Sequence, residues 1–123
     1  AFYGMPNLTE IEIAQSVTII GDYAFKNCPV LDGVVLPSGL THLGDSAFYA
    51  CEKLSAIEIP AALWTIKPYT FKNCTNLTTI NLEVVEVICE GAFCGCSALE
   101  NITFAEGVAI GDWAFSKTPV TIP

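Results

Sequence analysis

Apolar residues recur along this chain at an interval of 22 or 23 positions. A leucine stands six residues after each of five phenylalanines, and an isoleucine or valine stands nine residues after each of the same five. Six phenylalanines mark the period: Phe2, Phe25, Phe48, Phe71, Phe93 and Phe115. Because self-similarity at a fixed interval is the signature of a repeat protein, the pattern predicts five full repeats and a partial sixth.

Two short strands are predicted in each repeat. The segment 54–59 reads Leu-x-x-Ile-x-Ile, with the polar Glu58 between its last two apolar residues. Such alternation is typical of a half-buried strand. Pro60 ends that strand because proline has no backbone N–H to pair. Leu63 and Ile66 then form a second apolar pair, which is long enough for another short strand.

The segment before each phenylalanine has the composition of a turn. It reads Gly-Asp-Tyr-Ala-Phe at 21–25, with counterparts at 44–48 and 111–115. Glycine suits a turn with positive φ, and an acidic residue before Ala-Phe-x-x-Cys is typical of the N-cap of a helical turn. This reading assigns four acids as caps: Asp22, Asp45, Glu90 and Asp112.

A single repeat buries too few side chains to offset the entropy of ordering its backbone, so neighbouring repeats must stack. The predicted fold class is mainly β with short helical turns: a solenoid with a parallel sheet and rungs ~4.8 Å apart. Residues 1–123 form one domain. The later repeats are irregular, since Glu83 replaces a proline and the segment between Val108 and Ile110 is shortened, which predicts a looser C-terminal half.

These residues carry a family resemblance. The segment Leu54–Cys74 is similar to the repeat L-x-x-I-x-I-P-x-x-V-x-x-I-G-x-x-A-F-x-x-C of BspA-like leucine-rich repeats. The resemblance covers essentially the whole chain. It implies a leucine-rich-repeat protein at the cell surface or secreted, acting as a non-enzymatic module for protein or glycan recognition (adhesion). The alternative is a structural spacer that presents other domains and has no ligand of its own.

Composition excludes several other classes. The formal charge is −8, with five lysines and no arginine, so a basic nucleic-acid interface is not expected. No apolar run approaches the ~20 residues that a bilayer requires, so no membrane insertion is expected. No cofactor motif, metal-ligand cluster or catalytic set is present, and His42, the single histidine, lies two to three rungs from Cys94. The chain is therefore not predicted to be an enzyme.

Four of the six cysteines occupy one column, three residues after a phenylalanine: Cys28, Cys51, Cys74 and Cys96. Met5 and Thr118 take the same position in the outer repeats, so the column favours small core residues rather than disulfides. Cys89 and Cys94 lie outside the column. A bridge between these two, or one from Cys94 to another thiol, stays an alternative to free thiols.

Two rows of side chains are candidate ligand surfaces. Strand alternation points one row outward from the main sheet, on what the resemblance implies is the concave face: Glu12, Val35, Glu58, Asn81 and Thr103. The second row lies at the turns and is aromatic: Tyr23, Tyr49, Tyr69 and Trp113, with Tyr3 and Trp64 nearby. Ordinary solvent exposure of the first row, and packing between rungs for the second, are the alternatives.

The chain begins inside a repeat and stops at Pro123, with no polar capping repeat at either end. Since solenoids need such caps for solubility, we expect a segment of a longer array. Open strand edges also predict end-to-end self-association. The high mean hydropathy of +0.51 agrees with a chain that spends its inward columns on apolar residues.

Overall fold

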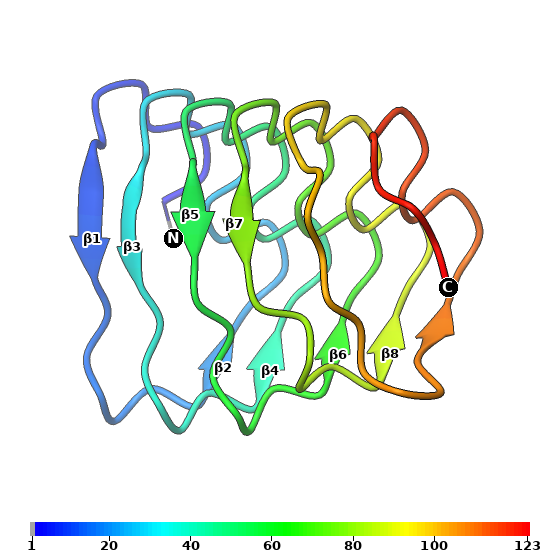
Figure 1. Ribbon diagram of the computed structural model, residues 1–123. Coiled ribbons are helices and arrows are strands. Elements are labelled where there is room, and N and C mark those ends of the chain that lie inside the picture. The colour runs from blue at the N-terminus through cyan, green and yellow to red at the C-terminus, as the bar shows by residue number, and fades with distance from the viewer. Residues whose placement is uncertain (1) are drawn as a thin grey trace.

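The computed structural model describes residues 2–123 (Figure 1). Each of the first four repeats contributes two short strands, and the fifth contributes one. The strands are β1 (Glu10–Glu12), β2 (Ile19–Ile20), β3 (Gly33–Val35), β4 (His42–Leu43), β5 (Ala56–Ile57), β6 (Thr65–Ile66), β7 (Thr79–Ile80), β8 (Val87–Ile88) and β9 (Ala109–Ile110). Within residues 2–123 no helix is long and apolar enough to cross a membrane.

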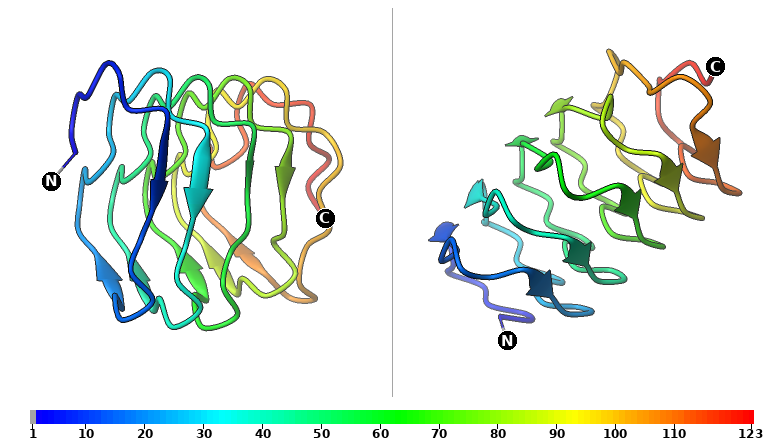
Figure 2. Two further views of the ribbon diagram at one scale, coloured as in Figure 1. Left: turned by 90° about the vertical axis from the view of Figure 1, so that its left-hand side faces the viewer. Right: turned by 90° about the horizontal axis from the view of Figure 1, so that it is seen from below.

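The strands form parallel ladders on two sides of the stack of rungs (Figures 1 and 2). On one side β1 pairs with β3 and β5 with β7, and a single bridge joins Leu82 to Phe104. On the other side β2 pairs with β4, and β6, β8 and β9 form a sheet of three. Partners lie 23 residues apart in the early repeats and 22 in the later ones, which confirms the predicted parallel solenoid. We call the outward side of β1, β3, β5, β7 and the Leu82–Phe104 bridge the main-sheet face.

The core is a set of columns that run along the stack. The six phenylalanine rings of the repeat lie one on another, with centroids 5.2 to 5.6 Å apart and planes within 10° of parallel. Phe48, Phe71 and Phe93 are completely buried. In the shortened fifth repeat, Phe104 packs edge-on against Phe115, with centroids 5.3 Å apart. Aromatic pairs in these geometries attract each other beyond the area they bury.

The segment around each phenylalanine is not the helical turn that the sequence analysis predicts. Residues 2–123 contain no helix, and this segment is a series of β-turns. Around Phe48, for example, Ser46 and Ala50 both have positive φ, 57° and 59°. The turn-closing bond from the Cys51 amide to the Phe48 carbonyl, with a positive φ at the third residue, is typical of a type II turn. The turn side comprises residues 2–5, 22–28, 45–51, 68–74, 90–96 and 112–118.

These turns bind each rung to the next. In all five pairs of neighbouring rungs, the backbone N–H of the repeat phenylalanine donates to a carbonyl of the next rung, at 2.7 to 2.9 Å. The acceptor is the residue directly before the phenylalanine of that next rung. The carboxylate of Asp22, predicted to cap its own turn, instead accepts the amide of Asp45 in the next rung, at 2.9 Å. A residue in the left-handed conformation lies on either side of the phenylalanine. These two residues turn alternate backbone N–H groups toward the neighbouring rung, whereas a helix would pair them within its own backbone.

The cysteine column is buried and unbridged, as predicted. Each thiol donates to the carbonyl of the phenylalanine one rung earlier, at 3.0 to 3.1 Å: Cys28 to Phe2, Cys51 to Phe25, Cys74 to Phe48 and Cys96 to Phe71. Cys89 and Cys94 are half-buried and also free, so both disulfide alternatives, between these two and from Cys94 to another thiol, are wrong. Each column cysteine therefore fills a small core position and links two rungs.

Candidate binding surfaces

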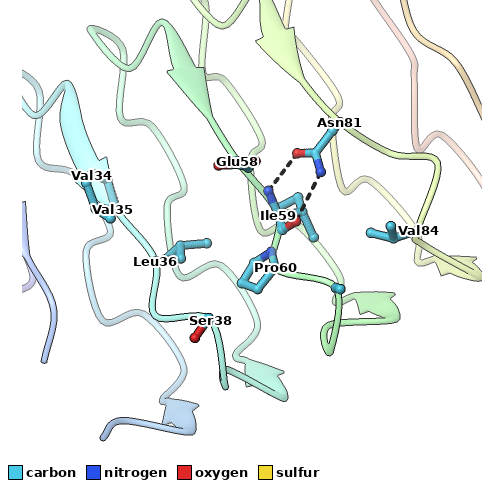
Figure 3. Close-up of a pocket in the computed structure, with 10 residues that line it drawn as sticks. Val34, Val35, Leu36, Ser38, Glu58, Ile59, Pro60, Asn81 and Val84 are labelled. Carbon is cyan, nitrogen blue, oxygen red and sulfur yellow. Dashed lines mark hydrogen bonds between the residues drawn. The ribbon is translucent and has the colours of Figure 1, made fainter. Parts of the chain in front are cut away.

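Four residues of the predicted outward row of the main sheet point to solvent: Glu12, Val35, Glu58 and Thr103. Asn81 does not extend freely. It is half-buried, and its Oδ1 accepts the Ile59 amide at 2.7 Å while its Nδ2 donates to the Ile59 carbonyl at 3.0 Å (Figure 3). Both polar atoms of this side chain are thus engaged by the neighbouring strand segment, in the manner of a paired backbone residue.

A groove of about 490 Å³ crosses the main-sheet face where β3 and β5 run into the following loops (Figure 3). Its lining is largely apolar and includes Val35, Leu36 and Pro60, and Glu58 supplies the carboxylate. A second groove, of about 360 Å³, shares Glu58 and Asn81 with the first and extends to Thr79 of β7. The two grooves give this face a hollow with apolar walls and a negative group.

The main-sheet face is acidic as a whole. The stretch seven to twelve residues after each repeat phenylalanine contains no lysine, whereas it contains these acids: Glu10, Glu12, Asp32, Glu58, Glu83 and Glu100. One of them is occupied, because a carboxylate oxygen of Asp32 accepts both the amide and the hydroxyl of Ser55, each at 2.8 Å. Glu12 and Glu58 extend into solvent. The face therefore carries a net negative charge, with these two carboxylates open to solvent.

The aromatic row of the turns is not one row in the structure. Tyr23, Tyr49 and Tyr69 gather with Tyr3 around two lysines, whereas Trp113 lies two rungs farther along and is 67% exposed. Trp64 lies beside β6 on another side of the rung, and its indole N–H donates to the Ala61 carbonyl at 3.0 Å. We call the cluster of Tyr3, Tyr23, Lys26, Tyr49, Tyr69 and Lys72 the Tyr–Lys belt.

The lysines of this belt escaped the sequence analysis. Lys26 and Lys72 occupy the position directly after a repeat phenylalanine, and Tyr3 and Tyr49 occupy the same position in the alternate repeats. The order Tyr-Lys-Tyr-Lys along that column was the signal. It places each ammonium beside ring faces, at centroid distances of 4.8 to 5.8 Å.

The cysteine thiols and the histidine do not have the environment of a reactive or metal-binding site. Burial raises the pKa of the Cys51 thiol to about 12 and that of Cys74 well above its ordinary value. This disfavours the thiolate, the reactive form of cysteine. His42 is exposed, with its Nδ1 3.0 Å from the Thr41 hydroxyl. Across residues 2–123 no three His, Cys, Asp or Glu side chains lie close enough together to hold a metal ion.

Comparison with protein families gives one match over almost the entire chain. The family model described as the BspA type leucine rich repeat region matches residues 1–121 in six copies. No curated protein matches the chain.

Three crystal structures are similar over nearly the full chain. A leucine-rich repeat protein from Bacteroides ovatus is 31% identical with a TM-score of 0.79, and the match covers 100% of this chain and 39% of that one. A leucine-rich repeat protein from Eubacterium ventriosum is 27% identical with a TM-score of 0.85, covering 99% and 34%. A leucine rich cell surface protein from Faecalibacterium prausnitzii is 28% identical with a TM-score of 0.83, covering 94% and 32%. The present chain therefore spans less than two fifths of the length of these three structures.

Proposed function

The chain belongs to the BspA-type leucine-rich-repeat family, and on that premise we propose that it is a recognition (adhesion) module of a cell-surface or secreted protein. The module binds a protein partner on the main-sheet face. Its family members are generally repeat proteins without enzymatic activity. The surface location is supported by the similarity to the cell surface protein from Faecalibacterium prausnitzii.

The groove around Glu58 is the observation that carries this proposal. Its apolar lining, with Val35 and Pro60, suits the aliphatic part of a lysine or arginine side chain, and its carboxylate suits the charged end. Long basic side chains bury their methylene groups while their charge stays near the rim. The groove thus favours an extended, basic segment of a partner protein.

Two substitutions of the groove test the proposal. Glu58→Lys reverses the charge in the hollow, and Thr79→Arg fills the second groove. Glu100→Lys is the matched control, because it makes the same charge change at an exposed position two rungs farther along and outside both grooves. The probes are an extracellular-matrix extract, analysed by pull-down, and a synthetic peptide of alternating lysine and valine, analysed by calorimetry.

The expected result is that both groove variants lose the matrix proteins and the peptide, whereas Glu100→Lys retains most of the binding. Asn81 is unsuitable as a test position, because its replacement also removes two bonds to Ile59. If wild type and groove variants capture the same proteins, the groove is not the site. A wild-type chain that captures nothing above background supports the spacer function instead.

A further inference from the structure

We infer that the Tyr–Lys belt binds an acidic glycan, a polysaccharide that carries carboxylate or sulfate groups. The inference deepens the proposed recognition function by giving it a second ligand on a different side of the rung. It requires no occupant in the groove around Glu58. The two sites are separable by experiment, because they share no residue.

The belt holds two ammonium groups in defined places. The Nζ of Lys26 lies 5.7 Å from the ring centroid of Tyr3, 5.2 Å from that of Tyr23 and 4.8 Å from that of Tyr49. The Nζ of Lys72 lies 5.8 Å from the ring centroid of Tyr49 and 5.5 Å from that of Tyr69. Tyr49 therefore stands between both charges.

Such contacts make good anchors for an anion. A ring face attracts an ammonium but does not neutralise it, so the positive charge stays available to a ligand. The rings also restrict a flexible side chain before the ligand arrives, which lowers the entropy lost on binding. Both lysines are half-buried along their length, whereas Tyr3 and Tyr23 expose 57% and 49% of their surface. The belt thus offers fixed cations beside open aromatic surfaces.

The spacing of the belt matches a polymer with a two-unit repeat. Lys26 and Lys72 occupy equivalent positions two rungs apart, which is about 10 Å. The disaccharide of an extended acidic polysaccharide has a similar length and commonly carries one anionic group. Tyr49, in the rung between, presents a ring against which the apolar face of a sugar packs. An extended acidic polypeptide fits less well, because its carboxylates on one face recur about every 7 Å.

Four of the five lysines of the chain lie within six residues after a repeat phenylalanine. The stretch one to six residues after each repeat phenylalanine contains one acid, Glu52, and four lysines: Lys26, Lys53, Lys72 and Lys117. The turn side as a whole is mixed in charge, because it also carries Asp22, Asp45, Glu90 and Asp112, so the positive charge is local to the belt lysines. The carboxylate closest in sequence to the belt is that of Asp22. One of its oxygens accepts the Asp45 amide. An anionic polymer is attracted to the two belt lysines and repelled by the main-sheet face.

The test compares two double variants with the same net charge. Lys26→Gln with Lys72→Gln removes the belt charges, and Lys53→Gln with Lys117→Gln removes two exposed lysines that are outside the belt. Affinity electrophoresis in gels containing hyaluronan, heparin, dextran or poly-glutamate measures binding. Circular dichroism verifies that each variant is folded. Hyaluronan tests carboxylates and heparin tests sulfates.

Wild type is expected to be retarded by hyaluronan, by heparin or by both, and not by dextran. The belt variant should bind at least about tenfold more weakly, which corresponds to about 1.4 kcal/mol, while the matched variant stays within about threefold of wild type. Replacing both belt lysines by arginine should preserve binding, since arginine also stacks on tyrosine. Added salt should weaken binding by screening.

Three outcomes overturn the assignment. Equal losses in the two glutamine variants mean that binding depends on net charge alone. Stronger retardation by poly-glutamate than by either glycan points to an acidic polypeptide. Absence of retardation in every gel removes the glycan site altogether. Glu58→Lys is measured in parallel. If the groove does not bind its peptide while the belt binds a glycan, or the reverse, this inference and the proposed function are tested separately.

Discussion

The turn side and the main-sheet face solve the same stacking problem in different ways. On the turn side all five pairs of neighbouring rungs are joined by the same backbone hydrogen bond. In each pair the phenylalanine ring of one rung also stacks on that of the next. On the main-sheet face the ladder is interrupted between β3 and β5 and narrows to one bridge at Leu82 and Phe104. The turn side therefore sets the rung spacing, and the opposite ladder is free to vary in its side chains.

This difference explains where the candidate sites lie. The grooves occur on the main-sheet face beside the interruption, where Val35 and Glu58 are exposed. The Tyr–Lys belt depends on the opposite property, because the lysines alternate with tyrosines only while the rungs stay in register. A variable face supplies shape, and a regular side supplies spacing.

The largest expected effect comes from breaking the phenylalanine stack. Phe71 is completely buried between the rings of Phe48 and Phe93. Phe71→Ala leaves a cavity and separates two halves of the stack, so we expect a loss of about 3–5 kcal/mol in the free energy of unfolding. Urea denaturation followed by circular dichroism measures it. The comparison is Phe104→Ala, at a half-buried ring outside the stack, where a smaller loss is expected.

A smaller effect is expected from one turn glycine. Gly91 has a φ of 61°, and a Cβ added there would overlap the ring of Tyr69. Gly91→Ala should cost roughly 2–3 kcal/mol, because it combines left-handed strain with a steric clash. Gly39→Ala is the control, since a Cβ there meets nothing within 4 Å and the residue lacks a positive φ. Equal melting temperatures for the two variants would show that the turn side tolerates local distortion.

The pH dependence of stability tests the buried thiols that link the turns. Burial raises the pKa of Cys51 to about 12 from 9.0, so the unfolded chain releases this proton at lower pH than the folded chain does. The contribution of the Cys51 thiol to the free energy of unfolding is complete below about pH 9 and is lost between about pH 9 and 12. Within that range the free energy of unfolding falls by at most about 1.4 kcal/mol per pH unit for one thiol.

Thermal unfolding of wild type and Cys51→Ala at several pH values from 8 to 11 measures this contribution. The stability advantage of wild type over the variant should shrink as the pH rises, since only wild type carries the Cys51 linkage. Effects of lysine and tyrosine titration are shared by both chains. Parallel curves would mean that Cys51 has an ordinary pKa in the folded chain.

The sequence predicted the positions that every repeat buries, but it did not predict the hydrogen bonds between neighbouring repeats. The inward columns, such as the one with Phe48 and Phe71, identified the core and the parallel register, because each rung must bury the same positions. The turn conformation was not predictable in this way. Ala50 and Trp113 adopt positive φ although neither residue type marks such a position. The conformation of Ala50 is stabilised by a hydrogen bond from its amide to the Lys72 carbonyl, 22 positions away, at 2.8 Å.

The candidate sites show the same division. Alternation along the strands correctly pointed Glu12 and Glu58 outward. It failed at Asn81, because alternation describes the direction of a side chain and not its reach. The amide of asparagine is long enough to bond the next strand segment at Ile59. Lys26 was missed for a related reason, since its ammonium is positioned by tyrosines from three different rungs.

The smallest expected effect comes from Asn81 itself. Asn81→Ala removes two hydrogen bonds to the backbone of Ile59, and we expect a loss of about 1–2 kcal/mol, since at this half-buried position water replaces part of them. Thr103→Ala, at the equivalent exposed position one rung later, should change stability by less than about 0.5 kcal/mol. Urea denaturation of both variants measures the difference. If Asn81→Ala is also neutral, the side-chain bonds merely follow the strand, and the regular turn side alone maintains the spacing of the rungs on the main-sheet face.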